Sequence, residues 1–95
     1  MLKLTSTSQF QRIETDIAEA EFEDKIVLLH INNGEYYNFN TTASDLWRWL
    51  AKPHSIDQLV KRLTDKYDCS ADACRPDICS WLTEAHQKRL IQEIL

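Results

Sequence analysis

The sequence predicts an α+β fold of the winged helix-turn-helix type, with an N-terminal three-stranded antiparallel sheet followed by three helices. A nearly continuous apolar run at residues 25–31 leads through Asn-Asn-Gly into an aromatic run at residues 35–39, which is the pattern of a β-hairpin. Beyond this hairpin, apolar residues recur at helical spacing in three stretches, and short polar side chains that can cap a helix precede each of them.

The composition fits one small folded domain. Of the 95 residues, 43% are hydrophobic and 27% are charged, so we expect a single domain over residues 1–95, with residues 1–8 flexible. The net charge of −4 argues against a nucleic-acid partner, which normally requires a basic face. No apolar run approaches the roughly 20 residues that span a bilayer, and the N-terminus lacks the apolar core of a secretion signal. We therefore expect a cytoplasmic protein that has no membrane partner.

The strands differ in how clearly the sequence marks them. Residues 9–15 suggest a short strand with imperfect alternation, and the acidic residues 16–24 are expected to form a solvated connector. Residues 25–31 are the clearest strand, because branched apolar side chains fill both of its faces. Gly34, the only glycine, tolerates the positive φ of a hairpin turn. In residues 35–39 the side chains alternate, so the two neighbouring tyrosines point to opposite faces.

Two helices follow the hairpin. Asn40 or Thr41 can cap the first, whose apolar stripe runs to Leu50, and Pro53 prevents this helix from continuing. The tetrapeptide Ser-Ile-Asp-Gln, which starts at Ser55, is a capping box because a Gln stands three residues after the capping Ser. It therefore predicts the start of the second helix.

The third helix has two candidate N-cap residues and an internal proline. Ser70 or Asp72 can cap it. Pro76 lacks an amide N–H and crowds the preceding turn, so the sequence predicts either a short separate turn before Pro76 or a kink there. Residues 90–95 are expected to form either a short terminal strand or a frayed extension of the helix.

The cysteines and histidines do not form a recognisable reactive or metal site. Cys69, Cys74 and Cys79 are spaced by five residues, so on one helix they point about 140° apart and cannot share a metal ion. Cys79 and His86 could be read as a nucleophilic pair, yet on one helix they lie about 10 Å apart. We expect no catalytic residue, no metal and no cofactor, and a small Cys/His enzyme is the least favoured alternative.

The helix-turn-helix elements raise the alternative of a DNA-binding regulator. A recognition helix needs basic or amide side chains that reach base edges and phosphates. The third helix offers Arg75, Gln87, Lys88 and Arg89, but it also carries several acidic side chains. With a net charge of −4 we expect no nucleic-acid partner, and a winged-helix regulator stays an alternative hypothesis.

The strand at residues 35–39 is the candidate binding element. If the sheet order follows the chain order, this strand lies at an edge, and only Glu35 protects that edge from pairing with another chain. An extended peptide can add to such an edge through main-chain hydrogen bonds, while pockets beside it select side chains. Alternatively, Tyr36, Tyr37 and Phe39 serve only as core and sheet surface, and the residues alone leave both interpretations open.

The ordered series of elements resembles the PQQ-biosynthesis protein D family, the precursor-peptide recognition elements of ribosomally made, modified peptides. The run V-L-L-H-I-N-N-G-E-Y-Y-N-F-N-T-T-A-S-D-L-W-R-W-L is similar to the central signature of that family. S-I-D-Q-L-V-K-R-L-T-D-K-Y-D resembles its second helix, and D-I-C-S-W-L-T-E-A-H-Q-K-R-L-I resembles its third helix and closing apolar segment. The similarity covers residues 22–94. Tyr36, Tyr37 and Trp47 look most like the standalone leader-binding subunits of lasso-peptide systems, whereas the turn N-N-G-E and Pro76 depart from the family pattern.

The resemblance implies a non-catalytic protein that binds the leader segment of a ribosomally synthesised precursor peptide by strand addition. It would deliver the precursor to a leader peptidase, and to a cyclase, for maturation of a lasso peptide. The implied leader-binding residues combine the edge strand with one stripe of the third helix and the ends of that stripe. They are Glu35, Tyr36, Tyr37, Asn38, Phe39, Arg75, Ile78, Cys79, Leu82, Ala85 and His86.

Overall fold

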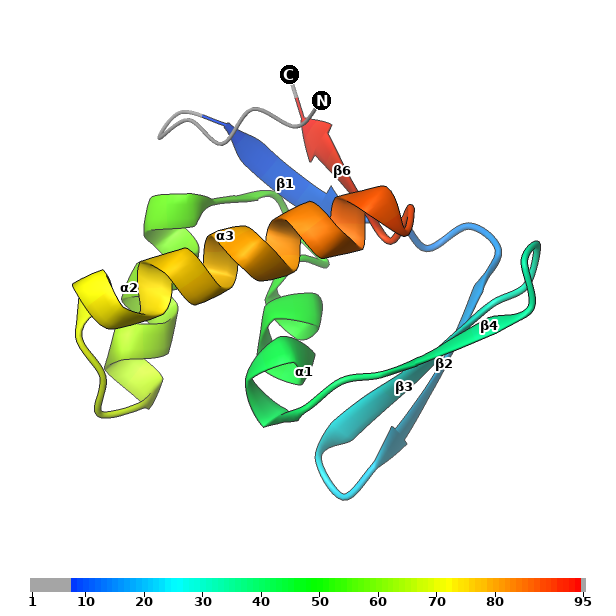
Figure 1. Ribbon diagram of the computed structural model, residues 1–95, viewed down its shortest axis with the longest axis horizontal. Coiled ribbons are helices and arrows are strands. Elements are labelled where there is room, and N and C mark those ends of the chain that lie inside the picture. Colours follow the sequence, from blue (N-terminus) through cyan, green and yellow to red (C-terminus); the bar gives the residue numbers. More distant parts are fainter. Residues whose placement is uncertain (1–7, 95) are drawn as a thin grey trace.

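The computed structural model describes residues 8–94, which form two small sheets and three helices (Figure 1). One sheet has the strand order β2-β3-β4, and the other has the order β5-β1-β6. All strand pairs are antiparallel. The strands are β1 (Gln9–Arg12), β2 (Ile17–Phe22), β3 (Lys25–His30), β4 (Glu35–Asn38), β5 (His54–Ser55) and β6 (Ile91–Ile94). The helices are α1 (Thr41–Trp49), α2 (Ile56–Lys66) and α3 (Ala71–Gln87).

The N-terminal segment and the lengths of the helices can be compared with the expectations from the sequence. Most of the segment expected to be flexible lies outside the described residues, and its last residue, Ser8, is buried. Among the helices of the described part, none has both the length and the apolar character needed to cross a membrane.

The predicted fold class is confirmed, but one strand of the main sheet is not the predicted one. Residues 16–24, expected to be a solvated connector, contain β2, which pairs with β3 at all six of its positions. The early strand at residues 9–15 exists as β1, but it belongs to the other sheet, where it pairs with β5 and β6. The sheet that contains the predicted hairpin is therefore built from β2, β3 and β4.

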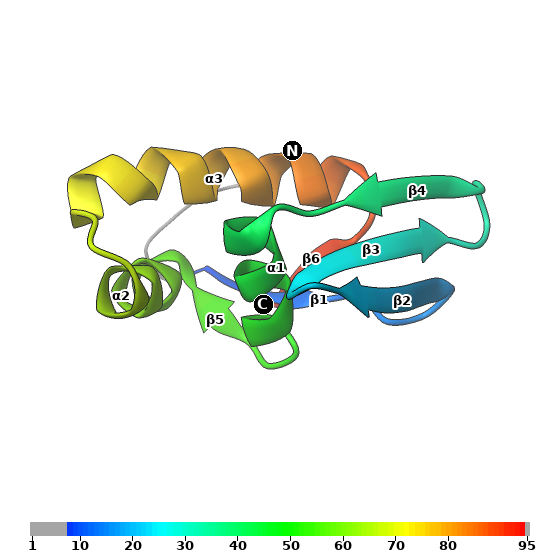
Figure 2. The same cartoon turned by 90° about the horizontal axis from the view of Figure 1, so that it is seen from below.

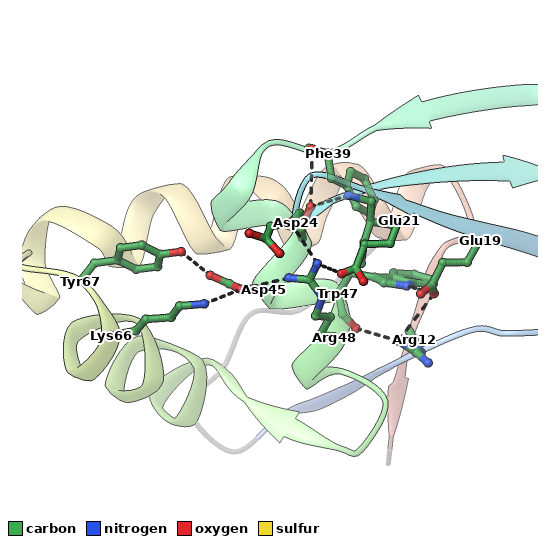
Figure 3. A network of polar contacts seen from close by, with 12 residues as sticks. Arg12, Glu19, Glu21, Asp24, Phe39, Asp45, Trp47, Arg48, Lys66 and Tyr67 are labelled. Carbon is green, nitrogen blue, oxygen red and sulfur yellow. Dashed lines mark hydrogen bonds and ion pairs between the residues drawn. The ribbon is translucent and has the colours of Figure 1, made fainter.

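The acidic side chains of β2 explain why this strand resembles a connector in the sequence. Glu19 accepts a hydrogen bond from Trp47 Nε1 at 2.7 Å, and Glu21 forms an ion pair with Arg48 (Figure 3). Arg48 also donates to the carbonyl of Asp24 at 3.0 Å, within the turn that joins β2 to β3. The partners of the two glutamates stand 28 and 27 residues further along the chain, so the local charge pattern cannot reveal them.

The core is formed by the helices together with strands of both sheets. Ile26 and Leu28, on one face of β3, have no exposed surface. The backbone of Ile26 is also fixed on both sides: its N–H donates to the Ser44 hydroxyl at 2.9 Å, and its carbonyl accepts from Phe39 N–H at 2.9 Å. Full burial of one large apolar side chain contributes about 1.5–3 kcal/mol to folding. The largest fully buried apolar side chains are Trp47, Phe10, Ile26, Leu28, Leu46, Leu50, Leu59, Ile78, Leu82, Leu90 and Ile91.

α3 is one uninterrupted helix that contains Pro76 (Figure 1), so the predicted separate turn before this residue does not exist. Ser70 caps the helix, and its hydroxyl accepts from Ala73 N–H at 3.1 Å. The N–H that Pro76 lacks would have bonded to the carbonyl of Asp72. Because Asp72 lies in the exposed first turn, water can satisfy that carbonyl, and the cost of the proline is reduced.

The end of α3 is a Schellman motif. Leu90 N–H donates to the Ala85 carbonyl at 2.9 Å, and Arg89 N–H donates to the His86 carbonyl at 3.1 Å. Arg89 has a φ of +60°, in the left-handed region that glycine normally provides at this position. The chain then enters β6, which is the first of the two alternatives predicted for residues 90–95.

Replacing Arg89 with glycine should stabilise the protein. Arg89→Gly relieves the left-handed strain of a residue with a Cβ atom, so we expect the free energy of unfolding to rise by about 1 kcal/mol. Urea denaturation followed by circular dichroism measures this change. The matched control Gln87→Gly, inside the same helix, should lower the free energy of unfolding by about 0.5 kcal/mol. A loss of stability in Arg89→Gly would contradict this account of the helix end.

Candidate functional site

The open edge of β4 is the main feature of the candidate site. β4 is the last strand of its sheet, and in the described part of the chain no strand pairs with its outer edge. Phe39 N–H donates to the Ile26 carbonyl, and hydrogen-bonded pairs alternate along an antiparallel ladder, so Tyr37 also bonds to β3. The backbone N–H and C=O groups of Tyr36 and Asn38 therefore face the open edge.

A groove lies between this edge and α3. Figure 2 shows that β4 is the strand of its sheet nearest to α3. Its volume is about 430 Å³, and we call it the edge cavity. A second cavity of about 500 Å³, the inner cavity, lies among α1, α2 and α3. The edge cavity is lined by Tyr36, Tyr37, Asn38, Phe39, Asn40, Ala43, Trp81, Glu84, Ala85, Lys88 and Leu90. The inner cavity shares Asn40, Ala43 and Trp81 and adds Thr42, Leu46, Leu63, Tyr67, Cys69, Ala73, Cys74, Asp77 and Ile78.

The two neighbouring tyrosines of β4 have different environments. Tyr37 is 9% exposed and Tyr36 is 68% exposed. The Tyr37 hydroxyl donates to Glu35 Oε2 at 2.8 Å, and Lys88 Nζ lies 5.1 Å from the centre of the Tyr37 ring. Burial, together with the hydrogen bond to Glu35, raises the pKa of Tyr37 above its usual value. Tyr37 is therefore the tyrosine that packs toward α3, and it stays neutral at physiological pH.

The residues of α3 that line the groove lie on a different stripe of the helix from the predicted one. Of the predicted wall residues, Ala85 lines the edge cavity, whereas Ile78 and Leu82 are 1% and 0% exposed and belong to the core. The most apolar stripe of an amphipathic helix packs on the core, so it is the adjacent stripe of α3 that lines the groove. That stripe consists of Trp81, Glu84, Ala85 and Lys88.

The remaining predicted residues of α3 do not line either cavity. Arg75 points toward α2, where its Nη2 pairs with Asp57 Oδ1 at 2.7 Å. Cys79 is half-buried against the core, and His86 is half-buried near the end of the helix. The structure therefore brings Tyr36, Tyr37, Asn38 and Phe39 together with Ala85 around the edge cavity. Glu35, Arg75, Cys79 and His86 do not line this cavity, and Glu35 instead accepts the hydrogen bond from the Tyr37 hydroxyl.

Trp81 is the principal groove residue that the sequence reasoning missed. Its ring centre lies 5.7 Å from that of Phe39 in an edge-to-face arrangement, so the two rings join α3 to the end of β4. The missed signal is the spacing of Trp81 from Ala85 and Lys88, which places all three on one helical face at the border of the core. Asn40, which caps α1 by accepting from Ala43 N–H at 2.8 Å, also lines both cavities.

A polar network fixes the wall of the inner cavity. Asp45 of α1 is 3% exposed and accepts hydrogen bonds from Lys66 Nζ at 2.8 Å, from Arg48 Nη1 at 3.3 Å and from the Tyr67 hydroxyl (Figure 3). Burial by itself pushes the pKa of Asp45 upward, but the hydrogen bonds from Lys66 and Tyr67 outweigh it, and the pKa is lowered. Asp45 is therefore ionised, and it holds Tyr67 in the cavity wall.

The Cys74 thiol, which lines the inner cavity, has a raised pKa. Burial is the main cause that raises the pKa of Cys74, and the neighbouring Cys69 raises it further. A raised thiol pKa keeps the sulfur protonated and weakly nucleophilic. Within residues 8–94, no group of three or more His, Cys, Asp or Glu side chains could hold a metal ion.

These features define a class of small α+β domains of the winged-helix type in which an open strand edge lies beside a groove. The sequence profile described as Coenzyme PQQ synthesis protein D (PqqD) matches residues 25–91, and the chain belongs to this family. The family resemblance drawn from the sequence is thereby confirmed. No curated protein sequence matches the chain.

Two solved structures are similar to this chain over most of its length. One is TbiB1 in complex with the TbiA(beta) leader peptide: it is 22% identical, with a TM-score of 0.77 over 86% of this chain and 95% of that chain. The other is lasso peptide synthetase B1 complexed with the leader peptide: it is 25% identical, with a TM-score of 0.75 over 87% of this chain and 96% of that chain. This chain therefore shares the fold of both proteins.

The Asp45 network should give the protein a specific acid sensitivity. Because the folded-state pKa of Asp45 is lowered, its contribution is present above the ordinary carboxyl pKa of about 4 and is lost as pH falls through the folded value. We expect Asp45→Asn to lower the free energy of unfolding by about 2 kcal/mol at neutral pH and by much less in acid. Urea denaturation across a pH series measures both effects.

The matched control for this prediction is Asp68→Asn, which removes an exposed carboxylate. It should leave both the stability and its pH profile nearly unchanged. If Asp45→Asn and the wild type lost stability in parallel as pH falls, the proposed role of the Asp45 carboxylate would be wrong.

Proposed function

We propose that this chain binds the leader segment of a ribosomally synthesised precursor peptide and delivers it for maturation into a lasso peptide. One observation carries the proposal: the open edge of β4 lies beside a groove in a member of the PqqD family. The similar solved structures support it, since both are complexes with leader peptides. On this proposal the leader extends the sheet β2-β3-β4 by one strand.

The leader pairs with the outward backbone groups of Tyr36 and Asn38. Side chains alternate along an added strand, so every second one enters the groove between β4 and α3. There the rings of Tyr37, Phe39 and Trp81 offer apolar contact, and the small side chain of Ala85 leaves room beside them. Main-chain bonds supply affinity, while the groove selects the side chains that enter it.

The chain acts in this scheme as a binding protein without catalysis. A leader peptidase, and a cyclase, carry out cleavage and ring closure on the precursor that the chain presents. The edge cavity suits binding, since its lining consists of aromatic, amide, apolar and charged side chains without a cysteine, serine or histidine. Because the precursor is made on ribosomes, the proposed place of action is the cytoplasm. The similar lasso peptide synthetase B1 supports the lasso class of product.

Proline substitution at Asn38 tests strand addition directly. The probe is the fluorescently labelled leader of a candidate precursor, sought as a short reading frame beside the gene for this chain, and fluorescence polarisation measures its affinity. We expect a Kd of about 1 μM or tighter for the wild type. Asn38→Pro removes an outward N–H without removing a bond to β3, so we expect at least about tenfold weaker binding with an unchanged circular dichroism spectrum.

The neighbouring position provides the control. Tyr37 bonds to β3, so Tyr37→Pro should disrupt the sheet itself and alter the circular dichroism spectrum as well as binding. Absence of measurable leader binding to the wild type would overturn the proposed function. Unchanged affinity in a folded Asn38→Pro variant would overturn the mode of binding.

A further inference from the structure

Two cysteines lie at the start of α3 in positions whose side chains usually meet. Ser70 is the N-cap of α3, so Cys69 is the residue before the cap and Cys74 is the fourth residue of the helix. Side chains at these two positions commonly pack against each other and fix the direction in which the chain enters a helix. Because Cys69 precedes the helix, the angle of about 140° that separates cysteines five apart on one helix does not apply to this pair.

The surroundings of the two thiols agree with contact between them. Both side chains line the inner cavity. The pKa of Cys74 is raised first by burial, then by the charge of Cys69 and by a side-chain hydrogen bond with Cys69. Such a bond forms only between atoms that lie side by side. Both residues are free thiols in the structure, so the pair is in its reduced form.

The two thiols differ in their access to solvent. Cys69 is exposed, whereas Cys74 is buried. A small oxidant in solution therefore reaches Cys69 first, and Cys74 lies behind it as the second thiol. Each sulfur otherwise has one weak contact, from Cys69 Sγ to the Leu63 carbonyl at 3.9 Å and from Cys74 Sγ to the Ala71 carbonyl at 3.8 Å. Little stabilisation is lost when the two sulfur atoms turn toward each other.

The first turn of α3 is the part of the helix that a bond between these thiols would support. Pro76 lies inside the helix and lacks an N–H, so the Asp72 carbonyl receives no main-chain hydrogen bond from it. Cys69 stands in the connection between α2 and α3, and Cys74 stands within the first turns of α3. A bond between them would span the Ser70 cap and join this connection to the helix.

We propose that Cys69 and Cys74 form a reversible intramolecular disulfide, with a low-molecular-weight disulfide of the glutathione class as the oxidant. The proposal concerns this pair alone and does not depend on leader binding. In the cytoplasm, the proposed place of action, disulfides are usually transient and redox-sensing. The pair would therefore make the start of α3 responsive to the redox state of the cell.

The reaction consists of two thiol–disulfide exchanges. The Cys69 thiolate attacks one sulfur of the oxidant, and the other half leaves as a thiolate that takes up the proton lost by Cys69. The Cys74 thiolate then attacks Cys69 Sγ, and the second half of the oxidant leaves in the same way. Two protein thiols are thus oxidised to one disulfide, while the oxidant is reduced to two thiols.

Controlled oxidation of the full chain tests the proposal. The reduced protein is incubated with mixtures of reduced and oxidised glutathione, and the remaining thiols are blocked with N-ethylmaleimide under denaturing conditions. Endoproteinase cleavage before Asp68, Asp72 and Asp77 places the three cysteines on separate fragments. We expect mass spectrometry to show fragments 68–71 and 72–76 joined by a disulfide, with Cys79 blocked by maleimide. Dithiothreitol should separate the two fragments again.

Thermal unfolding measures the effect of the bond on stability. The oxidised wild type should unfold about 5 °C above the reduced form, because the bond restricts the unfolded chain. Cys69→Ser should abolish this difference, and the exposed position of Cys69 makes the replacement compatible with folding. Cys79→Ser, the matched control in the same helix, should keep the full difference.

Several products would overturn the proposal. A glutathione adduct that persists on Cys69, a disulfide that includes Cys79 or a covalent dimer would show that Cys74 does not complete the reaction. An oxidised form that unfolds at the same temperature as the reduced form, or at a lower one, would show that the bond does not support α3.

Discussion

The backbone of Ile26 is the point on which the arrangement of the sheet and α1 depends. Its N–H bonds to the Ser44 hydroxyl of α1, and its carbonyl bonds to Phe39 N–H at the end of β4. Since the Ile26 side chain is fully buried as well, both its backbone and its side chain attach this end of the sheet to the rest of the fold. β4 is thus held on β3 by one edge only, and its other edge stays beside α3.

Polar contacts of α1 perform a similar role. The buried carboxylate of Asp45 joins α1 to the end of α2, and the more exposed Arg48 joins α1 to Glu21 of β2 and to the Asp24 carbonyl in the β2–β3 turn (Figure 3). Breaking one partner of a buried charged group leaves an uncompensated charge, so such contacts specify geometry more strongly than they add net stability. The short helix α1 consequently acts as the fixed element against which the groove walls are positioned.

Local rules predicted much of this fold from the sequence. The hairpin of β3 and β4, the capping box at Ser55 and the cap at Ser70 all depend on residues within a few positions of one another, and all are present. β2 was missed because the partners of its glutamates lie far along the chain on α1, where Trp47 donates a hydrogen bond to Glu19 and Arg48 forms an ion pair with Glu21. The cavity beside β4 is lined by the stripe of α3 next to the expected one, because the expected, most apolar stripe packs into the core. Tertiary packing determines both the formation of β2 and the choice of the α3 stripe that faces the groove.

The alternation of β4 has a consequence for how variable a bound sequence can be. Only Tyr36 and Asn38 offer outward main-chain groups, and a strand added there can shift only in steps of two residues if the same side chains are to enter the groove. Main-chain bonds do not depend on side-chain identity. The edge therefore recognises the spacing of side chains rather than a complete sequence. The alternate positions of a bound strand that point away from the groove can vary during evolution without loss of recognition.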